Sequence, residues 1–179
     1  SMAGIVQAFQ KIGRRTFFEW CDKGYLYLRD LDEQYSDWLC IPRSIKMTTI
    51  KPGGTIPLLP GATPGLHYAH AEYYIRNIRI AASSPLVALC KEAGHPVEPS
   101  STEPSTSVVS FPVHEKYFWK GKHDVSMWEQ LENAAQLQHY WSDNSVSITV
   151  TVKPEETKDI ATALSMYETR LKSVSFLPL

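Results

Sequence analysis

Residues 51–66 form the most unusual segment of the sequence, KPGGTIPLLPGATPGL, because glycine and proline are too frequent there for a helix or a central strand. Glycines adopt backbone angles that other residues avoid, so successive N–H groups can point into one concavity that suits a phosphate. The glycines concerned are Gly53, Gly54, Gly61 and Gly65. Beside them stand a lysine and two threonines, Lys51, Thr55 and Thr63. The Walker A pattern G-x-x-x-x-G-K-[ST] is absent, and a plain structural loop is the alternative to a phosphate site.

Two histidines, His67 and His70, follow this loop at a spacing that can present both to a metal ion. Glu72 is the one carboxylate placed to join them, and histidines in loops are more often hydrogen-bonded to their neighbours than bound to metal. We therefore expect no metal site.

Other charged residues have plainer explanations. Glu155, Glu156 and Asp159 fall in the first turn of an expected helix, where negative charge complements the helix dipole. Arg76 and Arg79 can reach an anion, but solvated arginines at a strand edge are the commoner case. Neither group predicts a catalytic site.

The three cysteines, Cys21, Cys40 and Cys90, are widely spaced and form no C-x-x-C pair. This pattern predicts reduced thiols rather than a disulfide framework or a zinc site.

Composition is that of an ordinary globular protein: 179 residues, 43% hydrophobic and 21% charged. The 18 Lys and Arg against 19 Asp and Glu remove the electrostatic argument for a general nucleic-acid or membrane-surface binder. No apolar run is long enough to span a membrane, and we expect a cytoplasmic protein. Ser1 and Met2 look like an expression scar, and residues 3–179 are expected to form the folded segment.

The periodicity of apolar residues predicts helices alternating with strands. Helices are expected over residues 3–21, from the break at 22–24 to just before Pro42, over 84–90, over 125–141 after an N-cap at Asp124, and from Pro154 to Leu171. Strands are expected over residues 46–50, 73–81, 108–113, 146–152 and 173–177, with a surface loop over 95–107. This order predicts an α/β fold with a partly parallel sheet. The terminal VSFLPL must be buried, with Val174 and Phe176 on one face.

Several blocks of the sequence resemble, in order and over residues 4–179, the C-terminal part of the catalytic barrel of the adenosylcobalamin-dependent (class II) ribonucleoside-triphosphate reductases. The blocks are SIKMTTIKPGGTIPLLPGATPGLHYAHAEYYIRNIRIA, SPLVALCKEAGHPVEP, VVSFPV, MWEQLENAAQLQHYWSDNSVSITVTV and LKSVSFLPL. The resemblance implies a partial ten-stranded α/β barrel of the ribonucleotide-reductase type. It also implies a family that uses adenosylcobalamin to make a cysteine thiyl radical, which reduces ribonucleotides at the 2′ carbon.

In this resemblance the glycine-rich segment corresponds to the loop that holds the substrate's phosphates. The residues carried over are Lys51, Pro52, Gly53, Gly54, Thr55, Ala62, Thr63, Pro64 and Gly65. Family members usually have Ser where this chain has Gly53, so one hydroxyl that can bind phosphate is missing.

The resemblance implies no catalytic residue in this chain. The radical cysteine with its Asn and Glu partners, the reducing cysteine pair and the C-terminal thiols have no counterpart, and none of the three cysteines has a matching context. The Tyr-Tyr radical relay of the class I reductases is also missing, since Ser175 and Phe176 stand there. We therefore expect this chain alone to be inactive and to hold no cofactor tightly.

Two functions are compatible with these features. The chain is a C-terminal fragment or truncated paralogue of a class II reductase that holds nucleotide phosphate and works with a missing reductase segment. Alternatively, it is a non-catalytic binding or oligomerisation module that associates through its sheet edges.

Overall fold

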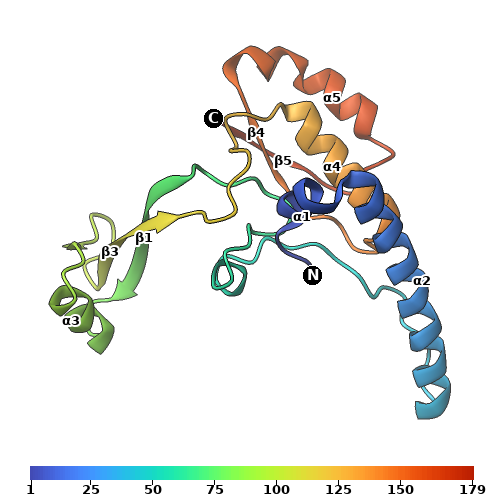
Figure 1. Cartoon of the computed structure of the whole chain (residues 1–179), viewed down its shortest axis with the longest axis horizontal. Helices are drawn as coiled ribbons and strands as arrows, with labels where there is room; N and C mark the ends of the chain where they lie inside the picture. The colour runs from blue at the N-terminus through green and yellow to red at the C-terminus, as the bar shows by residue number, and fades with distance from the viewer. The chain divides into compact units, whose positions relative to one another are not determined.

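The computed structural model describes residues 1–179 and shows a mixed α/β architecture (Figure 1). The chain divides into two compact units, residues 1–70 with 117–179, and residues 71–116. The first unit contains a two-stranded parallel sheet, and the second contains a three-stranded antiparallel sheet. The expected parallel pairing is therefore present but covers two strands, and a ten-stranded barrel is not seen in this chain.

Two helices open the first unit, α1 (Ile5–Ile12) and α2 (Arg14–Leu39). The prediction of a break at residues 22–24 is wrong, because the break lies at Gly13. Gly13 has φ 78° and ψ 152°, which stop a helix and which glycine adopts without a steric penalty. Gly24 is instead inside α2, where the long helix tolerates the roughly 1 kcal/mol that an interior glycine costs.

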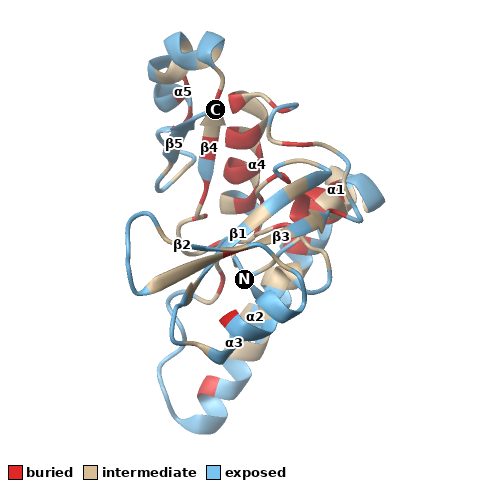
Figure 2. Ribbon diagram, turned by 90° about the vertical axis from the view of Figure 1, so that its left-hand side faces the viewer, coloured by how far each residue is buried: buried red, intermediate tan, exposed pale blue.

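The core of this unit is built around α4 (Met127–Tyr140), whose buried residues stand out in Figure 2. Phe9 of α1 meets Phe17 of α2 edge to face at 5.1 Å between ring centroids, and Phe18 completes the aromatic group. These rings pack with α4 in one hydrophobic cluster, so α1 is anchored on its inner face.

The expected N-cap Asp124 is wrong, because Ser126 caps α4 and its hydroxyl accepts a hydrogen bond from the Glu129 N–H at 3.1 Å. Asp124 instead accepts a hydrogen bond from the Gly121 N–H at 2.9 Å. Both residue types are good N-caps, but the Asp124 carboxylate is already bound to the Gly121 N–H, and Ser126 is the residue that caps α4.

The parallel pair consists of β4 (Thr149–Val152) and β5 (Ser175–Pro178). The chain passes between them through the 3-10 helix η2 (Pro154–Asp159) and α5 (Ile160–Tyr167), where a single helix was predicted. The strand predicted over residues 146–152 forms only from Thr149 onward. The alternation that predicted its buried face is confirmed, because four apolar positions are buried: Val146, Ile148, Val150 and Val152.

Side chains close the edge of β4 that faces away from β5. The amide of Gln130 accepts from the Thr151 N–H at 2.9 Å and donates to the Thr151 carbonyl at 3.0 Å, as a neighbouring strand would. The N–H of Thr149 donates to Nε2 of His67 at 3.1 Å. Two side chains therefore take the place of a further strand along this edge.

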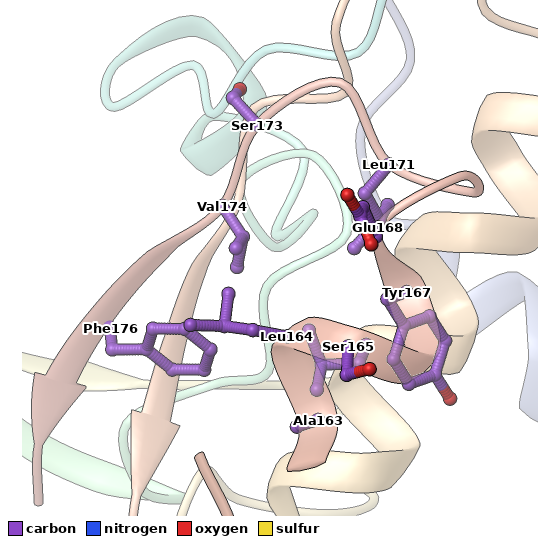
Figure 3. Close-up of a pocket in the computed structure, with 10 residues that line it drawn as sticks. Ala163, Leu164, Ser165, Tyr167, Glu168, Leu171, Ser173, Val174 and Phe176 are labelled. Atoms are coloured by element: carbon purple, nitrogen blue, oxygen red, sulfur yellow. The ribbon is translucent and has the colours of Figure 1, made fainter. Parts of the chain in front are cut away.

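The terminal strand packs only in part as expected. Val174 and Phe176 share a face and are half-buried against the core cluster, but Leu177 is exposed, so VSFLPL as a whole is not buried. Val174 and Phe176 border a hollow of about 400 Å³ against α5, in which Figure 3 shows Val174, Phe176 and Leu164 pointing toward one another.

The strand predicted over residues 46–50 is not formed, although the segment is extended. Its partner segment binds it irregularly: Asp143 accepts from the Met47 N–H, Asn144 donates to the Thr48 carbonyl, and the Ser147 N–H donates to the Ile50 carbonyl. Side chains interrupt the backbone ladder, so no strand is defined.

The second unit contains β1 (Tyr73–Ala81), α3 (Pro85–Glu92), β2 (Val97–Pro99) and β3 (Thr106–His114). Ser84 caps α3 with Pro85 in its first turn, and Gly94 at φ 82° follows the helix end, as predicted. The sheet order is β1-β3-β2. Residues 95–107 were expected to be a loop, but β2 lies within them because it pairs with β3.

Candidate phosphate loop

The two halves of the glycine-rich segment meet in the structure. A Cβ atom added at Gly65 would lie 3.1 Å from the carbonyl oxygen of Lys51 and 3.5 Å from Cγ2 of Ile50. The residues between them turn through the 3-10 helix η1 (Ile56–Leu58). The first and last of the nine predicted site residues are therefore neighbours, and only a residue without a side chain fits at the contact.

The glycines of the loop differ in backbone conformation. Gly61 and Gly65 have left-handed φ angles of 77° and 55°, whereas Gly53 and Gly54 are outside the left-handed region. The expectation that all four use glycine's special angles is therefore wrong for Gly53 and Gly54. Gly53 has a steric role instead, because an added Cβ would lie 2.9 Å from Cγ of Pro57. Gly54 has open space around it.

Several amide groups of the loop are already used within the chain. The Gly53 N–H donates to the Lys51 carbonyl at 3.1 Å, and the Ala62 N–H donates to the Pro57 carbonyl at 2.9 Å. The Lys51 N–H donates to Oγ of Ser1 at 2.9 Å. A ligand would therefore meet fewer backbone donors than the number of glycines implied.

Two buried threonine hydroxyls have no hydrogen-bond partner: that of Thr63 in the loop and that of Thr49, in the segment before it. Thr63 is only 2% exposed. An unpaired buried hydroxyl costs about 1–3 kcal/mol. Thr63, one of the predicted site residues, therefore lowers the stability of the chain as it stands.

A polar network lies behind the loop around Glu129. Its carboxylate accepts from the Tyr68 hydroxyl at 2.6 Å and from Lys120 at 2.6 Å, and Arg14 lies 3.4 Å away. Burial raises the pKa of Glu129, but the hydrogen bonds from Lys120 and Tyr68 outweigh it and hold the pKa below its ordinary value. Buried Asn133 accepts from Arg14 and donates to the Tyr68 hydroxyl. Sequence patterns did not reveal this group, because its members are far apart in the chain.

His67 has a structural position. Its Nδ1 lies 3.2 Å from the Pro64 carbonyl, and its Nε2 accepts from Thr149, so the neutral ring links the loop to β4. Burial lowers the pKa of His67. His70 is exposed and lies with its ring 6.0 Å from that of His123. The structure assembles no group of three or more His, Cys, Asp or Glu residues around a point where a metal ion would sit.

The lowered pKa of His67 predicts that the chain loses stability in mild acid. A histidine that binds protons less readily when folded stabilises the fold fully above its unfolded pKa of about 6.5 and loses that contribution as the pH falls below it. We expect the urea midpoint to fall between pH 7.5 and pH 5.5, and to fall less in His67→Gln. The exposed residue His139 supplies the control, because His139→Gln should keep the wild-type dependence. Equal dependence in all three proteins would contradict the assignment.

Of the three carboxylates expected in one first turn, Glu156 acts as expected, whereas Asp159 lies at the end of η2 and makes no side-chain cap hydrogen bond. Glu156 accepts from the Lys153 N–H at 3.1 Å and from the Met127 N–H at 2.9 Å, so it binds η2 to the beginning of α4. No catalytic role follows from this geometry.

The whole chain is similar in sequence to known ribonucleoside-triphosphate reductases. The chain is 47% identical over 179 residues to a probable adenosylcobalamin-dependent ribonucleoside-triphosphate reductase of Dictyostelium discoideum, which covers 99% of this chain and 24% of the relative. It is 44% identical over 180 residues to the adenosylcobalamin-dependent ribonucleoside-triphosphate reductase of Euglena gracilis, with 99% and 25% covered. The chain is homologous to a segment of these reductases. The resemblance seen in the sequence is thereby confirmed.

A crystal structure of a B-12 dependent (class II) ribonucleotide reductase matches the fold with a TM-score of 0.80 and 35% identity, covering 92% of this chain and 24% of that one. No family model matches the chain. This chain spans about a quarter of the length of the class II reductases it matches.

The relatives are named for adenosylcobalamin, a much larger ligand than a nucleotide. The hollow beside the loop, between α1 and residues 60–62, has a volume of about 690 Å³, which suits a drug-sized ligand rather than that cofactor. We therefore assign no step of cofactor chemistry to the residues of this chain.

The three cysteines of this chain are free thiols. Cys21 is buried in the core, and burial raises its pKa to about 11, which keeps it protonated and unreactive. Cys40 is exposed at the end of α2, and Cys90 is half-buried in α3. No helix of the segment is both long enough and apolar enough to cross a membrane.

Proposed function

We propose that this chain is the C-terminal barrel segment of a class II ribonucleotide reductase and that its loop binds the phosphates of a ribonucleoside triphosphate. The close approach of Gly65 to Lys51 supports the proposal, because it joins KPGGT and ATPG into one loop with a cationic side chain at its start. The radical cysteine and the remaining barrel strands belong, in this proposal, to other parts of the reductase. Residues 3–179 alone would then bind nucleotide without reducing it.

The unpaired hydroxyl of Thr63 provides a specific test of this proposal. Buried polar groups normally find a partner, and those that do not are often held for a ligand. In the proposed function the Thr63 side chain turns on binding and its hydroxyl donates to a phosphate oxygen, while the backbone of the turn stays in place.

Thr63→Val should therefore raise stability and weaken binding together. The valine removes an unsatisfied hydroxyl with little change in shape, so we expect the unfolding free energy to rise by about 1 kcal/mol. Calorimetric titration with tripolyphosphate and with a nucleoside triphosphate should show at least tenfold weaker binding than wild type. Thr49→Val, at the other unpaired hydroxyl, should stabilise the chain similarly and leave affinity unchanged. Absence of any binding by the wild-type chain would refute the proposed site.

A second function, an association module, is favoured by one feature. The outer edge of β5 has no partner strand, and Leu177 on that strand is 52% exposed. Exposed edges of this kind pair with other strands. A monomer by sedimentation at high concentration would count against this function.

A further inference from the structure

The Gly61–Gly65 turn of the candidate loop is held by the first helix of the chain. The Gly4 N–H donates to the Thr63 carbonyl at 2.9 Å, and the Ile5 N–H donates to the Gly65 carbonyl at 3.3 Å. The N-terminal amides of α1 are thus used on loop carbonyls, and the turn is attached to a helix.

Gln7 adds a second attachment through its side chain. Its Nε2 donates to the Gly61 carbonyl at 2.9 Å, and its Oε1 accepts from the Thr63 N–H at 3.0 Å. The two bonds fall on either side of Ala62, so one amide group fixes the turn at two points. Amide is the one side-chain type of this length that offers a donor and an acceptor together without charge.

Gln7 stands on a rigid support. Its neighbours on α1, Ile5, Val6 and Phe9, are 1%, 3% and 4% exposed. Gly4 lets the helix start approach the turn, because an added Cβ would lie 3.0 Å from Oε1 of Gln7 and 3.3 Å from Cβ of Ala62. Gly4 also has a left-handed φ of 68°, which glycine accommodates without strain.

We infer that Gln7 is a positioning residue for the phosphate loop, setting the conformation of Gly61–Gly65 in which phosphate is bound. The inference rests on the proposed function. Gln7 touches no phosphate in this role; it acts by holding the Thr63 N–H and the Gly61 carbonyl so that the turn needs little reordering when ligand arrives.

The first test removes both hydrogen bonds between the Gln7 side chain and the turn. Gln7→Met keeps the length of the side chain, and we expect at least tenfold weaker binding of tripolyphosphate and at least tenfold faster amide exchange at Thr63. Gln34→Met is the matched control, because Gln34 is an exposed glutamine of α2 and does not line the hollow between α1 and residues 60–62. It should leave both quantities at wild-type values.

The second test uses protonation to restore the clamp. In Gln7→Glu the carboxylate still accepts from Thr63 but repels the Gly61 carbonyl, whereas the protonated acid has an O–H to donate to it. The ratio of variant to wild-type affinity should therefore rise toward one as the pH falls from 7 to 4, across the ordinary glutamate pKa of about 4.3. Lys11 and Tyr117 line the adjoining hollow, and they are present in both proteins, so the ratio cancels their influence.

The outcomes separate the two claims. If wild type binds no tripolyphosphate, the proposed phosphate site fails, and the inference fails with it. If wild type binds and Gln7→Met binds equally well, only the inference is overturned. Equal losses in Gln7→Met and Gln34→Met, or a pH-independent Gln7→Glu ratio, would also overturn it.

Discussion

Gly65→Val is expected to lower the unfolding free energy by roughly 2–4 kcal/mol and to abolish measurable phosphate binding. A β-branched residue at a left-handed φ of 55° is strained by about 1–3 kcal/mol, and its Cβ would press on the Lys51 carbonyl 3.1 Å away. Relief of that contact separates the two halves of the loop. Urea unfolding and calorimetric titration with tripolyphosphate measure the two effects.

Gly54→Val is the matched control from the same loop. Gly54 has ordinary backbone angles and an added Cβ meets nothing within 4 Å, so we expect a stability change within about 0.5 kcal/mol. The expectation from the sequence that Gly54 uses glycine's special backbone angles predicts a large loss at this position instead. A loss at Gly54→Val equal to that at Gly65→Val would contradict the loop geometry.

Leu131→Ala is expected to lower the unfolding free energy by about 2–5 kcal/mol. Leu131 is 1% exposed on the inner face of α4, where it belongs to the main core cluster. Truncation removes buried methyl groups and leaves a cavity that rigid neighbours cannot fill. Equilibrium unfolding in urea, with an unchanged denaturant slope, measures the loss.

Leu164→Ala provides the comparison. Leu131 and Leu164 both border the hollow beside α5, but Leu164 is 47% exposed. We expect a loss below about 1 kcal/mol. Similar losses at both positions would mean that the hollow is closed by protein and that α5 packs more tightly than described.

The sequence predicted those elements whose signals are local. Residues Tyr73–Ala81 form the predicted strand with the predicted limits, and Ser84 caps the helix that follows. The alternation that ends at Val152 marked the buried face of its strand. In these cases a short run of residue types determines the conformation, so the sequence alone is enough to predict it.

Predictions failed where residues far apart in the chain decide between local alternatives. Glycines at positions 13 and 24 look equally able to end a helix, and tertiary packing of the long α2 ends the first helix at Gly13. Gln7 gave no signal at all, because a glutamine on an amphipathic helix is ordinary until its partner 56 residues away is known. The extent of the candidate phosphate loop was predicted from family resemblance, whereas only the structure shows that α1 supports it.

Because one edge of β4 is closed, a further strand can be added to this small sheet on one side only. With Gln130 and His67 occupying one side, a third strand has room only beside β5. There the N–H groups of Ser175 and Leu179 already point to β4, and Pro178 has no N–H, so Phe176 alone offers an outward donor between Ser175 and Leu179. A neighbouring strand can therefore register at the start of β5 and must part from it at Pro178.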